Sequence, residues 1–251
     1  MLILYKFIKH LIFITIKKLY WLFRLMQAKK GKNLQLSFPI RVEGSGKLSI
    51  GSNSKIDKNV YFGIGKGGKI IIGKNCRIDS GVQIIAGTGA SIIIGDNCWI
   101  MQNSIIRSKN SEFKINNNVI IATQVQIFSR EEGYEGSLLL KEGVRINDYV
   151  MLDITHDLII NEEVVVGQYS IIFTHDHNYK TSNRAVWKGE IELGTVLIDA
   201  GTWIGAKTVI MKNVKIGKRA LIASGAIVTK DCQAQSIYAG VPAKKIKSII
   251  D

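Results

Sequence analysis

The chain has 251 residues, enough for one large domain or two small ones, and its formal net charge at pH 7 is +14. A charge of this sign suits an anionic partner, such as nucleic acid, a membrane surface or a phosphorylated cofactor. The sequence contains no nucleic-acid-binding motif and no basic patch interleaved with aromatic residues, so we expect no nucleic-acid partner. Its three cysteines lack paired spacing, which excludes a disulfide framework and indicates a reducing compartment, the cytoplasm.

Residues 1–30 predict a basic amphipathic helix. Apolar residues dominate this stretch, but charges interrupt them so often that no apolar run of about 18 residues could span a bilayer. The opposite face to the charges is formed by leucine, isoleucine, phenylalanine, tyrosine and tryptophan. On a helical wheel most of the polar side chains fall within one arc of roughly 100°: Lys6, Lys9, His10, Lys17, Arg24 and Gln27.

A broad apolar face beside a cationic stripe is typical of a helix that lies in a bilayer interface. We therefore favour residues 1–28 as a peripheral contact with the inner face of the cytoplasmic membrane. The alternative is a helix that packs on the protein's own body or on another subunit. A secretory signal peptide fits poorly, because lysines interrupt the apolar core and no small-residue cleavage site follows it.

From residue 31 onward the pattern predicts short β-strands. Ile-Gly-x-Asn motifs at 50–53, 72–75 and 94–97 recur every 22 residues, and a related motif follows at 115–118. We interpret this spacing as an 18-residue coil with four extra residues in one turn, supplied by glycine- and serine-rich stretches. The asparagines of these motifs fall at one corner, where asparagine tolerates a left-handed backbone and can hydrogen-bond along a ladder: Asn53, Asn75, Asn97 and Asn118.

The middle of the chain interrupts this repeat. Residues 129–142 break the pattern and predict a loop between coils. The repeat then resumes with a widened turn at 155–157, which holds one histidine. The largest interruption, at 173–194, holds two more. Polar loops that project from a rigid scaffold commonly carry the chemistry of a protein.

The stretch 196–231 contains the clearest repeat of the chain. A period of six fits neither an α-helix nor a long strand, and it predicts a parallel β-helix in which three hexapeptides form one coil. Equivalent side chains would then stack about 4.8 Å apart in a shared core. We expect one elongated β-helix domain at 31–237, an N-terminal helix at 1–30 and a C-terminal tail at 238–251. Aliphatic residues recur at the interval of six: Ile198, Ile204, Ile210, Ile216, Ile222 and Val228.

Four motifs give the chain a resemblance to a known family: THDH at 174–177, WIGA at 203–206, GAIVTKD at 225–231 and AGVPAK at 239–244. With them, residues 45–247 resemble the hexapeptide-repeat acyltransferases, in particular the sugar O-acetyltransferases of the galactoside, maltose, nodulation-factor and polysaccharide type. The resemblance implies an all-β fold, a left-handed parallel β-helix and a homotrimer with active sites between neighbouring subunits. The handedness rests on the resemblance alone, because parallel β crossovers are overwhelmingly right-handed.

The resemblance implies transfer of an acetyl group from acetyl-CoA to a sugar hydroxyl. A hydroxyl needs a base when it attacks a thioester, and histidine has a suitable pKa. Similar enzymes place their catalytic histidine at the position of His175, and we expect His177 to line the same cleft. Asp153, Asp157 and Asp176 are the candidates to orient the imidazole, and the sequence does not choose among them. A backbone N–H group near the cleft should stabilise the oxyanion.

The resemblance also assigns the ligand contacts. Asn147 falls where similar enzymes contact the acceptor, and we group Asp153 with it as a second acceptor-binding candidate. Ala206 and Ser224 lie 18 residues apart, so they stack on one face, beside the pantetheine arm of acetyl-CoA. Basic residues suit the phosphates of the cofactor, and no metal is expected. Four further residues match positions that contact acetyl-CoA in similar enzymes: Thr229, Lys230, Lys244 and Lys247.

We therefore predict an acetyl-CoA-dependent O-acetyltransferase that attacks the thioester directly and modifies a sugar of a surface polysaccharide, lipopolysaccharide or lipid-linked glycan. The basic N-terminal helix favours a membrane-linked acceptor over a free sugar. One alternative is a zinc enzyme like the γ-class carbonic anhydrases, with His156, His175 and His177 as metal ligands across subunits. The other is a non-catalytic, membrane-associated trimeric scaffold.

Overall fold

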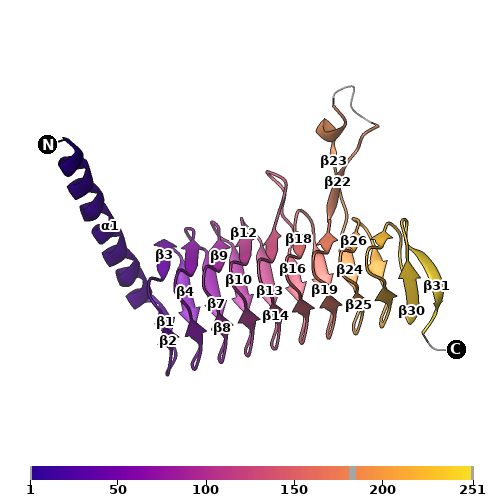
Figure 1. The fold of residues 1–251 in the computed structure, drawn as a ribbon, viewed down its shortest axis with the longest axis horizontal. Helices are drawn as coiled ribbons and strands as arrows, with labels where there is room; N and C mark the ends of the chain where they lie inside the picture. Colours follow the sequence, from indigo (N-terminus) through magenta and orange to yellow (C-terminus); the bar gives the residue numbers. More distant parts are fainter. Residues whose placement is uncertain (1, 181–184, 250–251) are drawn as a thin grey trace.

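A computed structural model describes residues 2–180 and 185–249 of the chain. It consists of one N-terminal helix, α1 (Leu2–Gln27), and an elongated parallel β-helix with three faces, which we call A, B and C (Figure 1). Met1, residues 181–184 and residues 250–251 lie outside the described residues, at the start of the predicted helix, in the largest interruption and at the end of the predicted tail. An all-β fold with parallel coils and an N-terminal helix is confirmed.

Each coil passes through the three faces in the same order. Face A contains β1 (Lys29–Lys30), β4 (Lys47–Ile50), β7 (Lys69–Ile72), β10 (Ser91–Ile94), β13 (Glu112–Ile115), β16 (Leu138–Leu140), β19 (Leu158–Ile160), β24 (Val196–Ile198) and β27 (Lys215–Ile216). Face B contains β2 (Gln35–Leu36), β5 (Lys55–Ile56), β8 (Arg77–Ile78), β11 (Trp99–Ile100), β14 (Ile120–Ile121), β17 (Arg145–Ile146), β20 (Val165–Val166), β25 (Trp203–Ile204), β28 (Leu221–Ile222), β30 (Ser236–Ala239) and β31 (Lys244–Ser248). Face C contains β3 (Arg41–Gly44), β6 (Tyr61–Ile64), β9 (Gln83–Ala86), β12 (Ile105–Ser108), β15 (Gln126–Phe128), β18 (Met151–Asp153), β21 (Ile171–Ile172), β26 (Val209–Ile210) and β29 (Ile227–Val228).

The core is a set of aliphatic side chains stacked in register along the coils. The six aliphatic residues of the hexapeptide stretch are each at most 1% exposed. Ile198 pairs with Ile216, 18 residues further along, and the next two members of the repeat pair in the same way. Because each coil contacts only its neighbours, this apolar stacking is the main force that holds the coils together. The predicted 18-residue coil is confirmed.

The extra residues of the 22-residue coils lengthen strands, which corrects the prediction that they form a longer turn. β6 and β7 have four residues each, whereas β26 and β27, in a shorter coil, have two each. Side chains alternate between the two sides of a strand, so two added residues bring one more side chain into the core. In β7 both Ile70 and Ile72 are buried.

The edge at which each coil turns from face A to face B, the AB edge, is the regular one. Asn53, Asn75, Asn97 and Asn118 have φ values of 59°, 54°, 58° and 59° in these turns. Asn53 Nδ2 donates to Asn75 Oδ1 at 3.2 Å, and Asn75 Nδ2 donates to Asn97 Oδ1 at 3.1 Å. Asn118 instead donates to Glu142 Oε1 at 2.8 Å. The asparagine ladder is thus confirmed for three members and then passes to a carboxylate.

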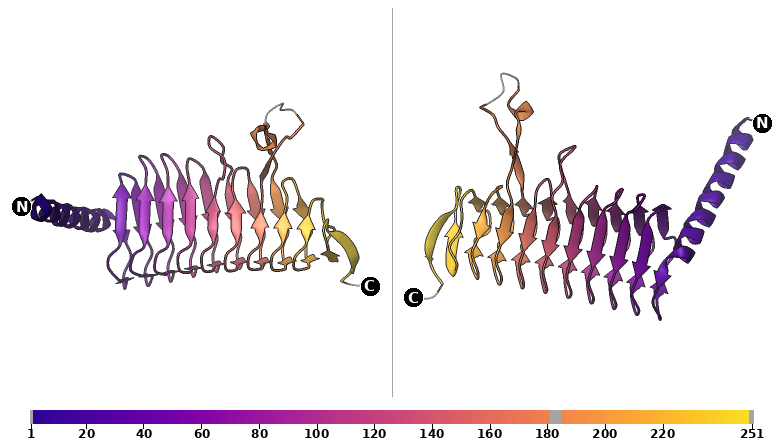
Figure 2. Two further views of the ribbon diagram at one scale, coloured as in Figure 1. Left: turned by 45° about the horizontal axis from the view of Figure 1, so that its top comes forward. Right: turned by 180° about the vertical axis from the view of Figure 1, so that it is seen from behind.

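The edge between faces C and A, the CA edge, carries the insertions. Residues 129–137 form a loop, and β16 follows directly, so the predicted loop at 129–142 ends five residues early. A second insertion forms the antiparallel hairpin of β22 (His175–His177) and β23 (Ile191–Leu193), with the 3-10 helix η1 (Val186–Lys188) between them. Both insertions project from the same side of the β-helix, as Figure 1 and Figure 2 show.

Both ends of the β-helix are covered by the segments next to them. At one end the C-terminal turns of α1 pack on the first coil, where Leu25 is 3% exposed and Trp21 Nε1 donates to Glu43 Oε1 at 3.2 Å, while the N-terminal part of α1 projects away (Figure 1). At the other end the backbone of Cys232 forms an isolated parallel β-bridge with Ile216 on face A. On face B, β30 pairs with β28, and on face C the backbone oxygen of Gly240 accepts a hydrogen bond from the N–H of Ile227. β31 then pairs antiparallel with β30.

The domain boundaries differ slightly from the predicted ones. β1 begins at Lys29, so the β-helix starts within the stretch predicted as helix. β30 crosses the predicted boundary after residue 237, so the C-terminal segment continues face B instead of forming a separate tail. Within residues 2–180 and 185–249, no helix is both long and apolar enough to cross a bilayer.

Candidate active site

His175 lies at the CA edge, where the chain leaves face C. It is the first residue of β22 and follows β21 after only two residues. Its side chain is 8% exposed, and its Nδ1 atom lies 2.6 Å from Oδ2 of Asp153, the last residue of β18. A carboxylate can only accept a hydrogen bond, so Nδ1 carries a proton and donates it. Nε2 of His175 is therefore the nitrogen available for chemistry.

Asp153 orients this imidazole from inside the β-helix. It is fully buried, and besides His175 its oxygens accept hydrogen bonds from Arg130 N, from Thr155 and from Thr174. Burial alone would raise the pKa of Asp153, but the hydrogen bonds from His175 and the two threonines outweigh it and hold the pKa below its usual value. In turn, the hydrogen bond to Asp153 raises the pKa of His175 against the opposing effect of burial.

The structure chooses among the three carboxylates that the sequence left open. Asp157 accepts hydrogen bonds from the backbone and side chain of Ser137, and Asp176 accepts one from the backbone N–H of the following residue. Neither faces the imidazole of His175. The prediction that Asp153 binds the acceptor does not fit its position, because the residue is 0% exposed and both of its oxygens are already hydrogen-bonded.

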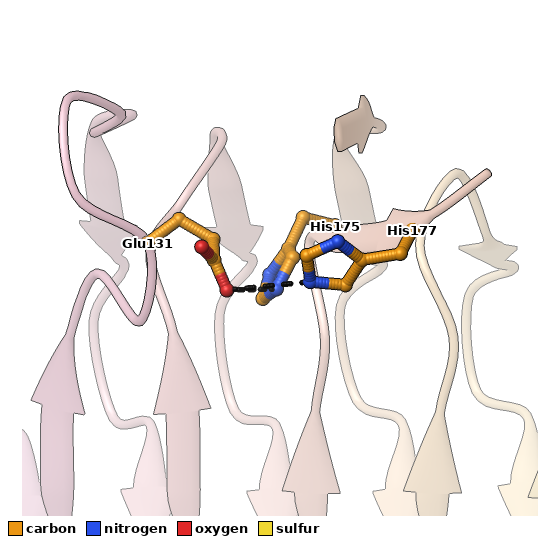
Figure 3. Close-up of side chains that lie close together, drawn as sticks. All are labelled: Glu131, His175 and His177. Carbon is orange, nitrogen blue, oxygen red and sulfur yellow. Dashed lines mark ion pairs between the residues drawn. The ribbon is translucent and has the colours of Figure 1, made fainter. Parts of the chain in front are cut away.

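Glu131, in the loop at 129–137, faces both histidines of the hairpin (Figure 3). Its Oε1 atom lies 3.3 Å from Nε2 of His175 and 3.5 Å from Nε2 of His177. The other ring nitrogen of His177, Nδ1, lies 3.3 Å from the backbone oxygen of Gly189. The two insertions of the CA edge thus meet at one point, and His175 and His177 lie together as the sequence predicted, with ring centroids 5.9 Å apart.

Glu131 is a site residue that the sequence pattern does not predict. The stretch 129–142 was predicted only as a loop between coils, and its acidic residues at 131, 132 and 135 were the available signal. Nothing in the repeat indicates that this loop meets a hairpin more than 40 residues away. Contacts between two insertions of unequal length follow no period, so periodicity cannot predict them.

A groove lies at the BC edge, where the coils turn from face B to face C. Ala206 and Ser224 stack there, as predicted, and Ala206 N donates to Ser224 Oγ at 3.1 Å. The groove has a volume of about 390 Å³, and Asn147 and the 59% exposed side chain of Trp203 also line it. Small side chains leave room for a narrow ligand close to the backbone. The structure thus brings together Asn147, Ala206 and Ser224.

The other four predicted cofactor contacts lie elsewhere in the chain. Thr229 and Lys230 follow β29 at the CA edge, and Lys244 and Lys247 lie on β31; all four are exposed. No single groove of one chain holds all six predicted contacts among the described residues. The groove with Ala206 and His175 also lie on different edges of the β-helix.

Within the described part of the chain, Glu131, His175 and His177 form the one group of three or more His, Cys, Asp or Glu side chains whose ligand atoms are close enough together to hold a metal ion. The predicted zinc set differs from it by one residue. His156 is not part of this group, and its Nδ1 atom lies 3.1 Å from Oγ1 of Thr195. One chain therefore does not assemble the three-histidine set of the alternative zinc enzyme.

Comparisons with known proteins agree with this fold. Residues 195–230 match the family model of the bacterial transferase hexapeptide, which describes six repeats. Together with the three parallel faces, this match confirms the hexapeptide-repeat resemblance, and hexapeptide repeats fit a left-handed parallel β-helix. Among solved structures, the chain is similar to the polySia-specific acetyltransferase NeuO, with a TM-score of 0.52 and 23% identity over 84% of this chain and 87% of that one. This likeness supports the fold alone.

Two curated relatives are similar over a shorter segment. One is the 2,3,4,5-tetrahydropyridine-2,6-dicarboxylate N-acetyltransferase of Staphylococcus aureus (strain bovine RF122 / ET3-1), 43% identical over 77 residues, which are 30% of this chain and 32% of the relative. The protein of the same name from strain JH9 is 47% identical over 66 residues, or 25% of this chain and 28% of the relative. The chain thus spans about a third of the length of the curated relatives that it matches.

Proposed function

We propose that the protein transfers an acetyl group from acetyl-CoA to a hydroxyl group of a sugar. The observation that carries this proposal is the Asp153–His175 pair, which holds an imidazole of raised pKa at the insertion-bearing edge of a hexapeptide-repeat β-helix. The curated relatives are acetyltransferases by name, which supports acetyl transfer as the class of reaction. The repeat scaffold itself does not determine the chemistry, so the site must carry the argument.

In the proposed reaction, Nε2 of His175 takes the proton of the acceptor hydroxyl while the hydroxyl oxygen attacks the thioester carbon. Asp153 stabilises the imidazolium that forms and keeps Nδ1 protonated throughout. When the tetrahedral intermediate collapses, the carbon–sulfur bond breaks and the imidazolium returns the proton to the leaving thiolate. The base is thereby regenerated, and no covalent intermediate on the protein is required.

We further propose that the pantetheine arm of acetyl-CoA lies in the groove of Ala206 and Ser224. Its negatively charged phosphates would meet the exposed lysines at 230, 244 and 247. His175 lies on a different edge from this groove, so both can serve one reaction when two neighbouring chains contribute to one site. This arrangement favours a homotrimer with its active sites between subunits.

The proposed acceptor is a sugar of a surface polysaccharide or of its lipid-linked precursor. An amine acceptor is the second candidate, because the curated relatives are N-acetyltransferases by name. The two products differ in a simple property: mild alkali cleaves an acetyl ester and leaves an acetamide intact.

The test uses the full chain, acetyl-labelled acetyl-CoA and matched pairs of acceptors, such as glucose with glucosamine and galactose with galactosamine. We expect release of the CoA thiol to depend on the acceptor, and we expect the label to enter the sugar as an alkali-labile ester. A label that survives alkali would replace the hydroxyl acceptor with an amine. Transfer at an unchanged rate in a His175→Ala variant would reject the proposed mechanism.

We also propose that α1 binds the anionic surface of the cytoplasmic membrane. Among the described residues, the contacts of the helix with the β-helix come from its C-terminal turns: Leu25 is buried, Arg24 Nη2 donates to the backbone oxygen of Gly46, and Trp21 Nε1 donates to Glu43 Oε1. Large apolar side chains farther along, such as Ile16 and Leu19, are about 60% exposed. An exposed apolar face beside a cationic stripe gains from both lipid burial and attraction to anionic headgroups.

Vesicle sedimentation tests this contact. The full chain should bind vesicles that contain phosphatidylglycerol and should bind pure phosphatidylcholine vesicles weakly. A triple variant in which Lys6, Lys9 and Lys17 become glutamate, and an Ile16→Asp variant, should both lose the binding. Equal binding to both kinds of vesicle would remove the electrostatic part of the proposal. A change of oligomeric state in Ile16→Asp without any change in lipid binding would show that a second copy of the chain covers this face instead.

A further inference from the structure

The two insertions of the CA edge bring three potential metal ligands to one point. One ligand atom from each of Glu131, His175 and His177 lies within 4.8 Å of the other two (Figure 3). The carboxylate oxygen is 3.3 Å from one nitrogen and 3.5 Å from the other. Around a tetrahedral Zn²⁺ ion with bonds of about 2.0–2.1 Å, ligand atoms lie about 3.3–3.5 Å apart. Two of the three separations therefore already suit such an ion.

The Nδ1 atoms of both imidazoles also donate hydrogen bonds, on the side of each ring that faces away from Glu131. Nδ1 of His175 donates to the buried carboxylate of Asp153 at 2.6 Å, and Nδ1 of His177 donates to the backbone oxygen of Gly189 at 3.3 Å. Acceptors at Nδ1 orient the histidines of many metal sites, because they leave the Nε2 lone pair pointing at the ion. In this protein the two Nε2 atoms point at the carboxylate of Glu131.

This arrangement requires a positive charge at its centre. Two nitrogen lone pairs and a carboxylate oxygen repel one another at these distances unless a proton or a cation lies between them. Asp153, directly behind His175, adds a second negative charge in a buried position. The site therefore has the ligand atoms, their orientation and the charge that a divalent cation needs.

We propose that Glu131, His175 and His177 bind one divalent transition-metal ion and that the bound ion inhibits acetyl transfer. Two imidazoles and one carboxylate suit Zn²⁺, whereas Mg²⁺ and Ca²⁺ prefer sites built from oxygen atoms. The side chains of Glu131 and His177 are 28% and 27% exposed, so solvent can reach the ion and a water molecule can complete its coordination. All three ligands come from one chain.

The inhibition follows from a shared atom. The ion takes the Nε2 lone pair of His175, and the same lone pair must accept the proton of the acceptor hydroxyl. Metal binding and proton transfer at this nitrogen are therefore mutually exclusive. This consequence rests on the proposed function, whereas metal binding itself does not depend on it.

Metal binding is tested on the full chain without a polyhistidine tag, after dialysis against a chelator and in the absence of acetyl-CoA. Calorimetric titration with Zn²⁺ should give one ion per chain, and Co²⁺ should give the intense visible absorption of a four-coordinate ion. The variants Glu131→Gln and His177→Ala each remove one ligand, so each should weaken binding by at least about 100-fold, the upper end of the loss that follows removal of an outer-shell partner. The control is His156→Ala, which removes a nearby histidine that lies outside the group and should bind as the wild type does.

The activity arm uses the same protein with acetyl-CoA and an acceptor. Transfer should fall as the site fills with Zn²⁺ and should return when a chelator is added. Equal Zn²⁺ affinity in the wild type, Glu131→Gln and His177→Ala would overturn the site, as would the absence of binding at millimolar Zn²⁺. Transfer that is unchanged or accelerated by bound Zn²⁺ would overturn the inhibition. A protein that binds Zn²⁺ with the expected variant pattern but transfers no acetyl group would support the metal site and reject the proposed function.

Discussion

The AB and CA edges of the β-helix are built on the same coils and differ in what their polar side chains contact. At the AB edge each turn has the same length, so an asparagine meets its own equivalent one coil away, as Asn75 meets Asn53 and Asn97. At the CA edge two turns are expanded, and unlike side chains meet instead, as Glu131 meets His175. In turns of equal length, the polar side chains hydrogen-bond to their equivalents in the neighbouring coils. Unequal turns leave some of those groups, here the Nε2 atoms, for ligands.

A substitution at His175 is the most direct test of this difference between the AB and CA edges. His175→Ala removes the proposed base, so we expect kcat to fall by up to about 10⁴-fold. Asn97→Ala, which changes a polar residue at the AB edge, should leave kcat unaltered. Both are measured with saturating acetyl-CoA, and circular dichroism checks that the fold persists. If His175→Ala retains wild-type turnover while His177→Ala is inactive, His177 is the base.

A substitution at Asp153 tests whether the buried hydrogen bond to His175 at the CA edge contributes to catalysis. Asp153→Asn keeps the size of the side chain but replaces an acceptor by a group that can also donate, which no longer fixes the proton on Nδ1 of His175. We expect kcat to fall by about 100-fold or more. Asp157→Asn is the matched control, since Asp157 contacts Ser137 and not the imidazole. Equal rates in the two variants would show that Asp153 has only a structural role.

Substitutions at Ala206 and Ala200 test which edge of the β-helix binds the cofactor. Each lies two residues after a buried isoleucine, Ala206 at the BC edge and Ala200 at the AB edge. Ala206→Trp should fill the groove and raise KM for acetyl-CoA about tenfold, equivalent to roughly 1.4 kcal/mol of binding. Ala200→Trp should leave KM unchanged. The two values come from initial rates over a range of acetyl-CoA concentrations, and equal values would place the cofactor elsewhere.

The smallest expected effect concerns stability at the AB edge. Asn75 has a φ of 54° and joins the ladder through two side-chain hydrogen bonds. Asn75→Gly keeps the backbone conformation accessible and loses the two bonds, so it should cost about 1 kcal/mol. Asn75→Ala also suffers the steric penalty of a left-handed residue, about 1–2 kcal/mol more. Urea unfolding measures both, and a glycine variant no more stable than the alanine variant would contradict the conformational argument.

The sequence predicted most of the fold because the fold is periodic. Ile198 and its equivalents share one environment in every coil, so a single observation about one of them holds for all. The asparagine ladder follows from the same regularity. The prediction of longer turns in the 22-residue coils was wrong, because the spacing gives the number of added residues but not whether they lengthen a turn or a strand. In β6 and β7 they lengthen the strands.

The site was less predictable because it joins segments that share no period. The resemblance placed His175, but the sequence offered three carboxylates as its partner. Only the fold shows that Asp153 ends a strand of the coil before the hairpin, directly behind the imidazole. Glu131 was missed altogether, because its contact depends on the heights of two insertions above the same edge.

The pairing of β30 with β31 bears on how these molecules behave at high concentration. The open end of a parallel β-helix presents unsatisfied backbone groups on which another copy could add coils and begin a fibre. β31 runs antiparallel at that position on face B, and it carries Lys244, Lys245 and Lys247. An approaching copy would meet a strand of the wrong direction and like charges. Lys244 and Lys247, which are candidates for the cofactor phosphates, thus also act against end-to-end polymerisation.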